Sequence, residues 1–364
     1  MLNTISQILQ KETLTRTDFI TLLSVRSAEA TQLVLDKAYQ VKTETVGRKV
    51  YLRGLIELTN ICAKNCFYCG IRAANIKVER YSLSVEEVLQ AADFAWKNGF
   101  GSLVIQTGEQ QSRAFADMIE DLLIMIHDTT NHELSVTLSC GEQELSVYER
   151  WRKAGAGRFL LRIETSNRDL YHKIHPNDNF HSFESRIKAL NDLRIAGFQV
   201  GTGVMIGLPE QSIGDLADDL IFFKTMDIDM IGMGPFIEHA DTPLYAKNHM
   251  LWPAHERFRM SLLMLALARI TMPDINIASS TALETLDPLG RQKGLLAGAN
   301  VVMPNLTPVS SRKKYQLYNN KPHLDKDAAL SAASLQKIIH DIGEVIGFNE
   351  AGSSLHFKNR VGSV

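Results

Sequence analysis

The chain has 364 residues, 45% of them hydrophobic and 22% charged, and this ordinary balance excludes a disordered or fibrous protein. Lysine and arginine number 39 and aspartate and glutamate 41, so the net charge of -2 favours neither nucleic acid nor a membrane surface as a partner. The apolar runs are strand-sized or broken by charge, and the N-terminus lacks an apolar signal core. We therefore expect a cytoplasmic protein without a transmembrane helix.

Residues 1–49 show helical apolar patterns and predict an N-terminal helical extension. From residue 50 onward, apolar runs alternate with amphipathic stretches. Strands are predicted near Tyr51–Leu58, Gly101–Gln106, Leu134–Leu138, Arg158–Arg162, Gln199–Val204, Met230–Met233, Ile275–Ala278 and Asn300–Met303. Helices are predicted near Ser84–Asn98, Arg113–Asp128, Ser146–Ala154, Ser182–Ala196, Ile213–Met226, Ala254–Ile270 and Leu289–Ala297.

Eight strands separated by helices, without runs of hairpins, predict a (β/α)8 barrel over residues 50–310. A doubly wound open sheet is the alternative. Several helices end just before a glycine (Gly99, Gly155, Gly197 and Gly298), which is typical of a left-handed C-cap. The remaining segment, 311–364, is expected to close the barrel, with one amphipathic helix over Leu330–Phe348.

The strongest local signal is a group of three cysteines, Cys62, Cys66 and Cys69, spaced C-x3-C-x2-C. The motif follows the first predicted strand, so it lies at the C-terminal mouth of the barrel, where the active sites of this fold are found. Three thiolates can bind three irons of a [4Fe–4S] cluster and leave the fourth iron open. A structural zinc site is the alternative, but it needs a fourth ligand. Cys140, the remaining cysteine, is expected to be a small packed residue.

The motif, with Tyr68 before its last cysteine, resembles the signature of the radical S-adenosylmethionine (SAM) enzymes. In that family the open iron binds SAM, and the reduced cluster cleaves it to methionine and a 5′-deoxyadenosyl radical. The order of further segments resembles the HydE type of [FeFe]-hydrogenase maturase, which is related to biotin synthase and methylornithine synthase. These segments are Ile105–Glu109, Val136–Ser139, Leu161–Thr165, Gly203–Pro209, Ile231–Phe236, Ser279–Ala282, Asn300–Asn305 and Tyr315–Tyr318.

The resemblance implies a set of SAM-binding residues. Glu109, after Gly108, is expected to accept the methionyl ammonium group, and Arg186 to bind the methionyl carboxylate. Arg162 and Glu164 lie at the end of the fourth strand and are expected to face the same way, with Glu164 touching SAM. Tyr68 and Met205 are placed beside the adenine. For each of these residues a structural role, such as an ion pair, a turn or core packing, remains the alternative.

A substrate pocket is expected from side chains at the strand ends, most of them hydroxyls. The candidates are Gln106, Thr107, Thr137, Ser280, Thr281, Met303, Tyr315 and Tyr318. Such a neutral, donor-rich lumen suits a small polar or anionic ligand.

By resemblance, the expected function is SAM cleavage in hydrogenase H-cluster assembly, acting on a small iron–CO–cyanide complex. The expected partners are the other hydrogenase maturases and a reductant such as ferredoxin or flavodoxin. Three alternatives remain: a mutase acting on an amino acid, as in methylornithine synthase; radical chemistry on a small thioether compound; and a non-catalytic iron–sulfur carrier.

Overall fold

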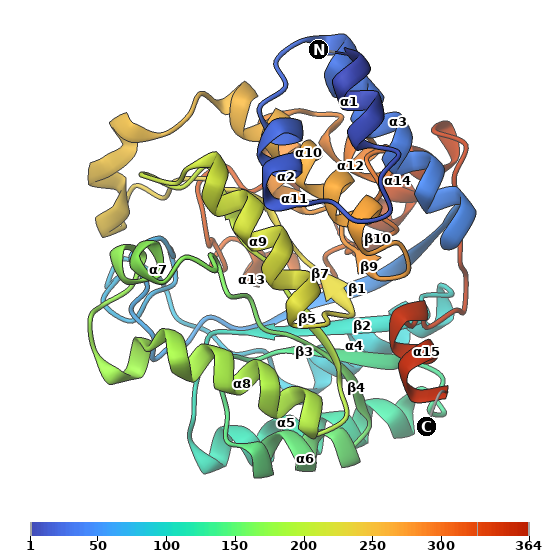
Figure 1. Ribbon diagram of the computed structural model, residues 1–364. Coiled ribbons are helices and arrows are strands. Elements are labelled where there is room, and N and C mark those ends of the chain that lie inside the picture. Colours follow the sequence, from blue (N-terminus) through green and yellow to red (C-terminus); the bar gives the residue numbers. More distant parts are fainter. Residues whose placement is uncertain (1, 326, 363–364) are drawn as a thin grey trace.

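The computed structural model describes residues 2–325 and 327–362, which contain eight parallel strands curled into a barrel (Figure 1). In barrel order these strands are β1 (Lys49–Thr59), β2 (Ser102–Thr107), β3 (Ser135–Ser139), β4 (Ala156–Leu160), β5 (Gln199–Thr202), β7 (Met230–Ile231), β9 (Asn276–Ile277) and β10 (Val301–Val302). β10 pairs with β1, and a parallel bridge between Ala278 and Val301 joins β9 to β10. The ring is therefore closed, which confirms the (β/α)8 prediction and excludes the doubly wound open sheet.

Helices surround the barrel close to the predicted positions. They are α4 (Val85–Lys97), α5 (Arg113–Thr129), α6 (Leu145–Lys153), α8 (Phe183–Ile195), α9 (Ile213–Thr225), α10 (Ala254–Thr271) and α12 (Gly290–Leu296). Several short elements were not predicted from the sequence. They are the helices α7 (Arg168–Ile174), α11 (Thr281–Leu286) and α13 (Val309–Arg312) and the 3-10 helices η1 (Asn179–His181) and η2 (Pro243–Met250). The two short strands β6 (Met205–Ile206) and β8 (Gly234–Pro235), which pair with each other, were not predicted either. All four predicted C-cap glycines have the positive φ angle that this role requires.

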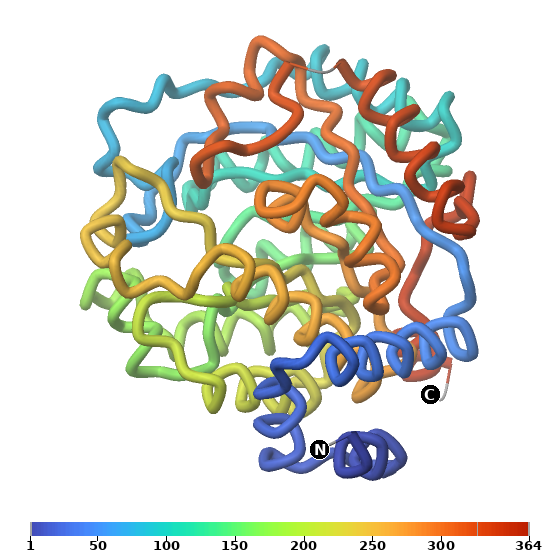
Figure 2. Tube along the Cα trace, turned by 90° about the horizontal axis from the view of Figure 1, so that it is seen from above, coloured from blue at the N-terminus to red at the C-terminus, as the bar shows by residue number. Residues whose placement is uncertain are grey.

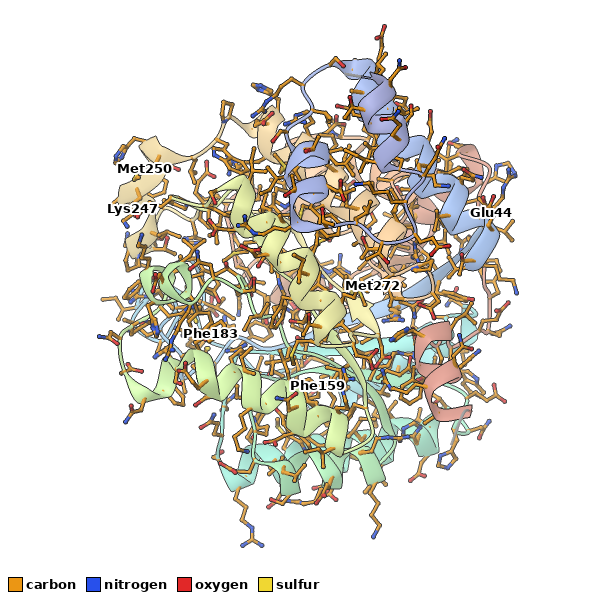
Figure 3. The ribbon with its side chains drawn as sticks, in the orientation of Figure 1. Glu44, Phe159, Phe183, Lys247, Met250 and Met272 are labelled. Atoms are coloured by element: carbon orange, nitrogen blue, oxygen red, sulfur yellow. The ribbon has the colours of Figure 1, made fainter. Side chains whose placement is uncertain are left out.

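Side chains of the strands alternate between the helices and the barrel interior, as the period of a strand requires. On β4, Phe159 (labelled in Figure 3) faces outward and packs against Tyr148 and Trp151 of α6. Arg158 and Leu160 face inward. The outward layer supplies much of the buried apolar surface, and the inward layer is available for polar side chains.

The N-terminal extension consists of α1 (Leu2–Ile8), α2 (Arg16–Leu23) and α3 (Ala28–Thr45). These helices pack against the outer helices, α3 on α10 and α2 on α9, so that the extension lies beside the barrel (Figure 2). Across the described residues, no helix is both long and apolar enough to cross a membrane.

The C-terminal segment differs from the prediction of a single helix over Leu330–Phe348. Helix α14 (Ala328–Asp341) ends earlier, just before Gly343, whose φ of +76° is typical of a left-handed C-cap. The chain then pairs with β1 through β11 (Val345–Ile346) and ends in α15 (Leu355–Gly362). In Figure 1, α15 lies at the opposite end of the barrel from α7.

This last segment closes the end of the barrel where the strands begin. Two buried lumen arginines donate to its backbone carbonyls, Arg53 to Gly352 (3.2 Å) and Arg158 to Ala351 (2.9 Å). Asn276 donates to the Gly352 carbonyl as well (2.8 Å). The floor of the lumen is therefore polar and sealed by the tail.

The α15 helix is anchored by His356, which lies between Asp227 (2.6 Å) and Asp274 (3.1 Å). Hydrogen bonds with these carboxylates raise the pKa of His356 to about 9. Because the folded pKa lies above the ordinary value, the stabilisation is complete below about pH 6.5 and is lost as the pH rises through 9. His356→Gln should thus lower the free energy of unfolding by about 1 kcal/mol at pH 6 and have little effect at pH 10.

Thermal unfolding at pH 6, 8 and 10 checks this prediction. Lys358→Gln, an exposed change on the same helix, is the matched control and should behave like the unaltered protein at each pH. A constant difference between His356→Gln and the unaltered protein across the whole range would contradict the titration of this anchor.

Candidate active site

The cysteine motif lies on the loop that leaves β1 at the mouth of the barrel. Its three cysteines are partly buried, and the Sγ of Cys62 accepts a hydrogen bond from the backbone N–H of Glu109 (3.3 Å). Gly108 allows this approach, since a Cβ there would lie 2.3 Å from the Ile61 carbonyl oxygen and 2.8 Å from the Cβ of Cys62. The end of β2 and the cysteine loop are thus packed backbone to backbone.

Arg80 holds the returning part of the loop in place. Its guanidinium donates to the carbonyls of Asn60 (2.6 Å), Ile71 (2.7 Å) and Arg72 (2.7 Å), which lie on both sides of the motif. One planar side chain therefore joins the start and the end of the loop.

Burial raises the pKa of all three cysteine thiols, to about 12 for Cys66. Three cations oppose this effect, because Arg186 lies near Cys66, Arg80 near Cys62, and Arg72 near both Cys66 and Cys69. The thiols need a metal partner to become thiolates, and the surrounding cations balance the negative charge that thiolates would bring.

The arrangement fits an iron–sulfur cluster better than zinc. In the described part of the chain, no group of three or more His, Cys, Asp or Glu side chains converges on a single metal ion. Thiolates that bind three different irons of one cluster need not converge in this way, whereas a tetrahedral zinc site must. Cys140, the remaining cysteine, is fully buried, as expected for a packed residue.

Beside the cysteines, four buried charged side chains form an alternating square. Lys64 lies between Glu109 (3.2 Å) and Glu142 (3.0 Å), and Arg186 contacts Glu142 (2.5 Å) and Glu109 (3.5 Å). Burial raises the pKa of Glu109 more than Arg186 lowers it. Burial also acts to raise the pKa of Glu142, but the charges of Arg186 and Lys64 outweigh this and leave it lowered. Two cations and two carboxylates leave the square neutral.

Arg162 and Glu164 form an ion pair of 3.0 Å, and the Arg162 carbonyl accepts a hydrogen bond from Arg186 (3.0 Å). Both line the cavity, as their alternation predicted. Glu164 is held at a φ of +68°, where its N–H donates to the Gly203 carbonyl (3.0 Å) and its carbonyl accepts from the N–H of Met205 (2.9 Å). Such a left-handed backbone costs about 1–3 kcal/mol for a residue other than glycine and is typical of functional sites.

A cavity of about 240 Å³ extends from the cysteines into the barrel. Most of the predicted site residues line it together: Cys62, Cys66, Tyr68, Cys69, Gln106, Thr107, Gly108, Glu109, Arg162, Glu164, Arg186, Met205, Ser280, Tyr315 and Tyr318. The Ser280 hydroxyl is buried and has no hydrogen-bond partner among the described residues, so it is available to a ligand.

Three predicted substrate residues lie outside this cavity. Thr137, in the interior of β3, accepts a hydrogen bond from Arg158 (3.1 Å) near the barrel floor. Thr281 begins α11 and accepts from Arg291 (3.1 Å), and Met303 lines two smaller cavities of about 30 Å³. The structure therefore does not bring these three side chains to the cysteines.

Lys64 and Glu142 were missed by the sequence analysis, although both carry a recognisable signal. Lys64 stands inside the cysteine motif, and Glu142 follows β3 by three residues, at the mouth where β2 and β4 also place charged side chains. His175 and His181 were missed as well, and both are buried.

These features define a radical SAM enzyme, which uses a [4Fe–4S] cluster and SAM. A family model described as the Radical SAM superfamily matches residues 56–223. The chain is 38% identical over 353 residues to the [FeFe] hydrogenase maturase subunit HydE of Thermotoga maritima, covering 96% of this chain and 97% of that protein. The chain belongs to the HydE family of radical SAM enzymes.

Solved structures share the fold at lower identity. HydG, a maturase of the [FeFe]-hydrogenase, superimposes with a TM-score of 0.82 at 19% identity, covering all of this chain and 81% of that one. Methylornithine synthase superimposes with a TM-score of 0.79 at 22% identity, covering 95% and 97% of the two chains. At these identities the likeness extends to the fold alone.

Proposed function

We propose that this protein acts in assembly of the [FeFe]-hydrogenase active site and that its substrate is a small iron complex carrying CO and cyanide. The observation that carries the proposal is the 38% identity to HydE along nearly the whole of both chains. The partners would be the other hydrogenase maturases and a reductant such as ferredoxin or flavodoxin.

The roles proposed for the charged residues follow from the family resemblance, and their positions fit these roles. Glu109 would accept the methionyl ammonium group of SAM, and Arg186 would bind the methionyl carboxylate. Because these two groups of SAM carry opposite charges, their binding leaves the square neutral. Glu164 would accept a ribose hydroxyl. When bound, the reduced cluster and SAM supply a 5′-deoxyadenosyl radical.

Tyr68 and Met205 would pack beside the adenine. The apolar side chains that they contact, among them Phe236 and Leu208, are buried and would exclude water from that side. Closing that side of the site matters because a reactive carbon radical abstracts hydrogen from any C–H or S–H donor that comes within reach.

The cavity beyond SAM supports a small neutral or weakly charged ligand. On this side it is lined by Gln106, Ser280, Tyr315 and Tyr318, which offer hydroxyl and amide groups. Such groups can donate hydrogen bonds to the nitrogen of a bound cyanide.

An amino-acid substrate would need two charged partners of its own. In this proposal, the charged residues that line the cavity bind either SAM or one another beside the cysteines; they are Lys64, Glu109, Arg162, Glu164 and Arg186. This favours the iron complex over the amino-acid mutase as the proposed reaction.

Complementation tests the proposal. The purified, cluster-loaded protein is added to an in vitro maturation mixture that contains apo-hydrogenase and the partner maturases but lacks HydE. Hydrogen evolution is expected to recover, and a Cys66→Ala protein should not restore it. A protein that cleaves SAM yet restores no hydrogen evolution across several partner systems would contradict the proposal, and conversion of lysine to methylornithine would indicate the mutase.

A double variant, Tyr315→Phe with Tyr318→Phe, tests the cavity within the same assay. It should still cleave SAM, since neither hydroxyl belongs to the charged SAM-binding set, but should lower the hydrogenase yield about tenfold because substrate positioning is lost. Equal yields from the double variant and the unaltered protein would remove these two hydroxyls from the substrate site.

A further inference from the structure

The segment 174–181, from the last residue of α7 to the end of η1, contacts four residues of the cysteine loop. The Phe67 N–H donates to the Ile174 carbonyl (3.0 Å), and the Asn65 N–H donates to the Nε2 of His181 (2.8 Å). The Lys64 ammonium donates to the Phe180 carbonyl, and the Tyr68 hydroxyl lies 3.3 Å from the Nε2 of His175. These contacts fall on both sides of Cys66, so the segment forms a cradle for the centre of the motif.

His175 presents a defined acceptor to Tyr68. Its Nδ1 lies 2.9 Å from the Tyr171 carbonyl, which can only accept, so Nδ1 carries the proton and Nε2 carries the lone pair. The ring stacks on Tyr171 with centroids 4.0 Å apart and meets Tyr68 edge-on at 5.3 Å. Burial lowers the pKa of His175 to about 3, in keeping with a neutral ring.

His181 has the same tautomer for a different reason. Its Nε2 faces the backbone N–H of Asn65, which can only donate, so this nitrogen must be unprotonated. Its Nδ1 lies 2.7 Å from Asp178, whose carboxylate also accepts the His181 N–H and so fixes the η1 turn. Only 3% of His181 is exposed, and water cannot replace this acceptor.

We propose that His175 and His181 are positioning residues, which hold the cysteine loop in the shape that binds SAM by acting as neutral hydrogen-bond acceptors. His181 fixes the backbone at Asn65, between Cys62 and Cys66, and His175 fixes the ring of Tyr68, between Cys66 and Cys69. The proposal rests on the SAM cofactor and not on the identity of the substrate, so its test needs no hydrogenase.

The experiment compares SAM binding and cluster content in matched variants of the full-length protein. After anaerobic reconstitution, iron is counted, and SAM is titrated while the EPR signal of the reduced cluster is recorded. His181→Leu removes the acceptor, and His181→Gln places an amide oxygen where it can accept from Asn65. We expect roughly tenfold weaker SAM binding in His181→Leu, with most of the loss recovered in His181→Gln.

His175 is tested through its partner. His175→Phe keeps the stacking on Tyr171 but removes the Nε2 acceptor from the Tyr68 hydroxyl, which also lies within hydrogen-bond reach of Cys66, and it should also weaken SAM binding roughly tenfold. The double variant with Tyr68→Phe removes both partners, so it should bind SAM no more weakly than His175→Phe alone. His172→Phe, on the same helix, is the control and should bind SAM as the unaltered protein does.

If His181→Leu fails to load the cluster, recovery of the iron content in His181→Gln supports the proposal. If His181→Leu loads the cluster, recovery of the SAM affinity in His181→Gln supports it. A His181→Gln protein as defective as His181→Leu would overturn it for His181. Losses that simply add in the His175→Phe and Tyr68→Phe double variant would overturn it for His175, because independent effects show that the two side chains do not act through one hydrogen bond.

Discussion

Replacing Cys62, Cys66 or Cys69 with alanine is expected to abolish both the cluster and the cleavage of SAM. Each thiolate would bind a different iron, and no other cysteine reaches the motif, because Cys140 is buried against the carbonyl of Ile105. Iron should fall from about four atoms per chain to background, and 5′-deoxyadenosine formed with dithionite and SAM should fall below detection.

Cys140→Ala is the matched control for these variants. It also removes a buried thiol near the mouth of the barrel, yet it should keep about four irons and cleave SAM at close to the normal rate. Retention of SAM cleavage in a Cys66→Ala protein, or loss of the cluster in Cys140→Ala, would contradict the assignment of the ligands. About eight irons per chain in a protein free of adventitious iron would contradict a single cluster.

Arg186→Met is expected to have the largest effect among the charged residues. It removes one cation from the buried square and leaves Glu109 and Glu142 opposed by Lys64 alone. Leaving an uncompensated buried charge costs about 3–5 kcal/mol of unfolding free energy. SAM binding should weaken about ten- to hundredfold as well, because a charged hydrogen bond to its carboxylate is lost.

A second variant separates these two effects. Arg186→Met combined with Glu142→Gln removes one positive and one negative charge, so the Lys64–Glu109 pair stays neutral and most of the stability should return. SAM binding should remain weak, because the group that binds the carboxylate is still absent. Urea unfolding of the apo-protein and EPR titration with SAM measure the two quantities. Recovery of SAM affinity along with stability would mean that Arg186 acts only as a structural partner.

The helices and the barrel class were predictable because their signals are local. Helix α4 was expected over Ser84–Asn98 and spans Val85–Lys97, since Ser84 and Glu87 form a capping box that fixes its start. The strands β7 and β9 keep only two paired residues each, yet their apolar runs still marked their place in the alternation. Repeated alternation of strand and helix then left few architectures other than a barrel.

The chemistry of the mouth was predictable for the same reason. Three cysteines within eight residues need no long-range information to indicate a cluster, and the loop after the first strand must lie at the mouth of a parallel barrel. Glu109, Arg162 and Glu164 follow strands directly, so strand geometry alone brings them to the cavity.

The partners of those residues depended on the tertiary structure. Lys64, Glu142 and Arg186 come from three loops or helices far apart in the chain, and their pairing follows from how these elements pack at the mouth. The same holds for His175 and His181, whose roles depend on which donor of the cysteine loop each ring meets.

The sequence by itself determined the barrel, its helices and the cluster motif, because each rests on residues a few positions apart. Only the tertiary structure decided that Thr137, Thr281 and Met303 lie outside the main cavity, and that the tail turns back to close the barrel floor. The depth of a side chain in a barrel depends on strand stagger and curvature, and these arise from the packing of the whole ring.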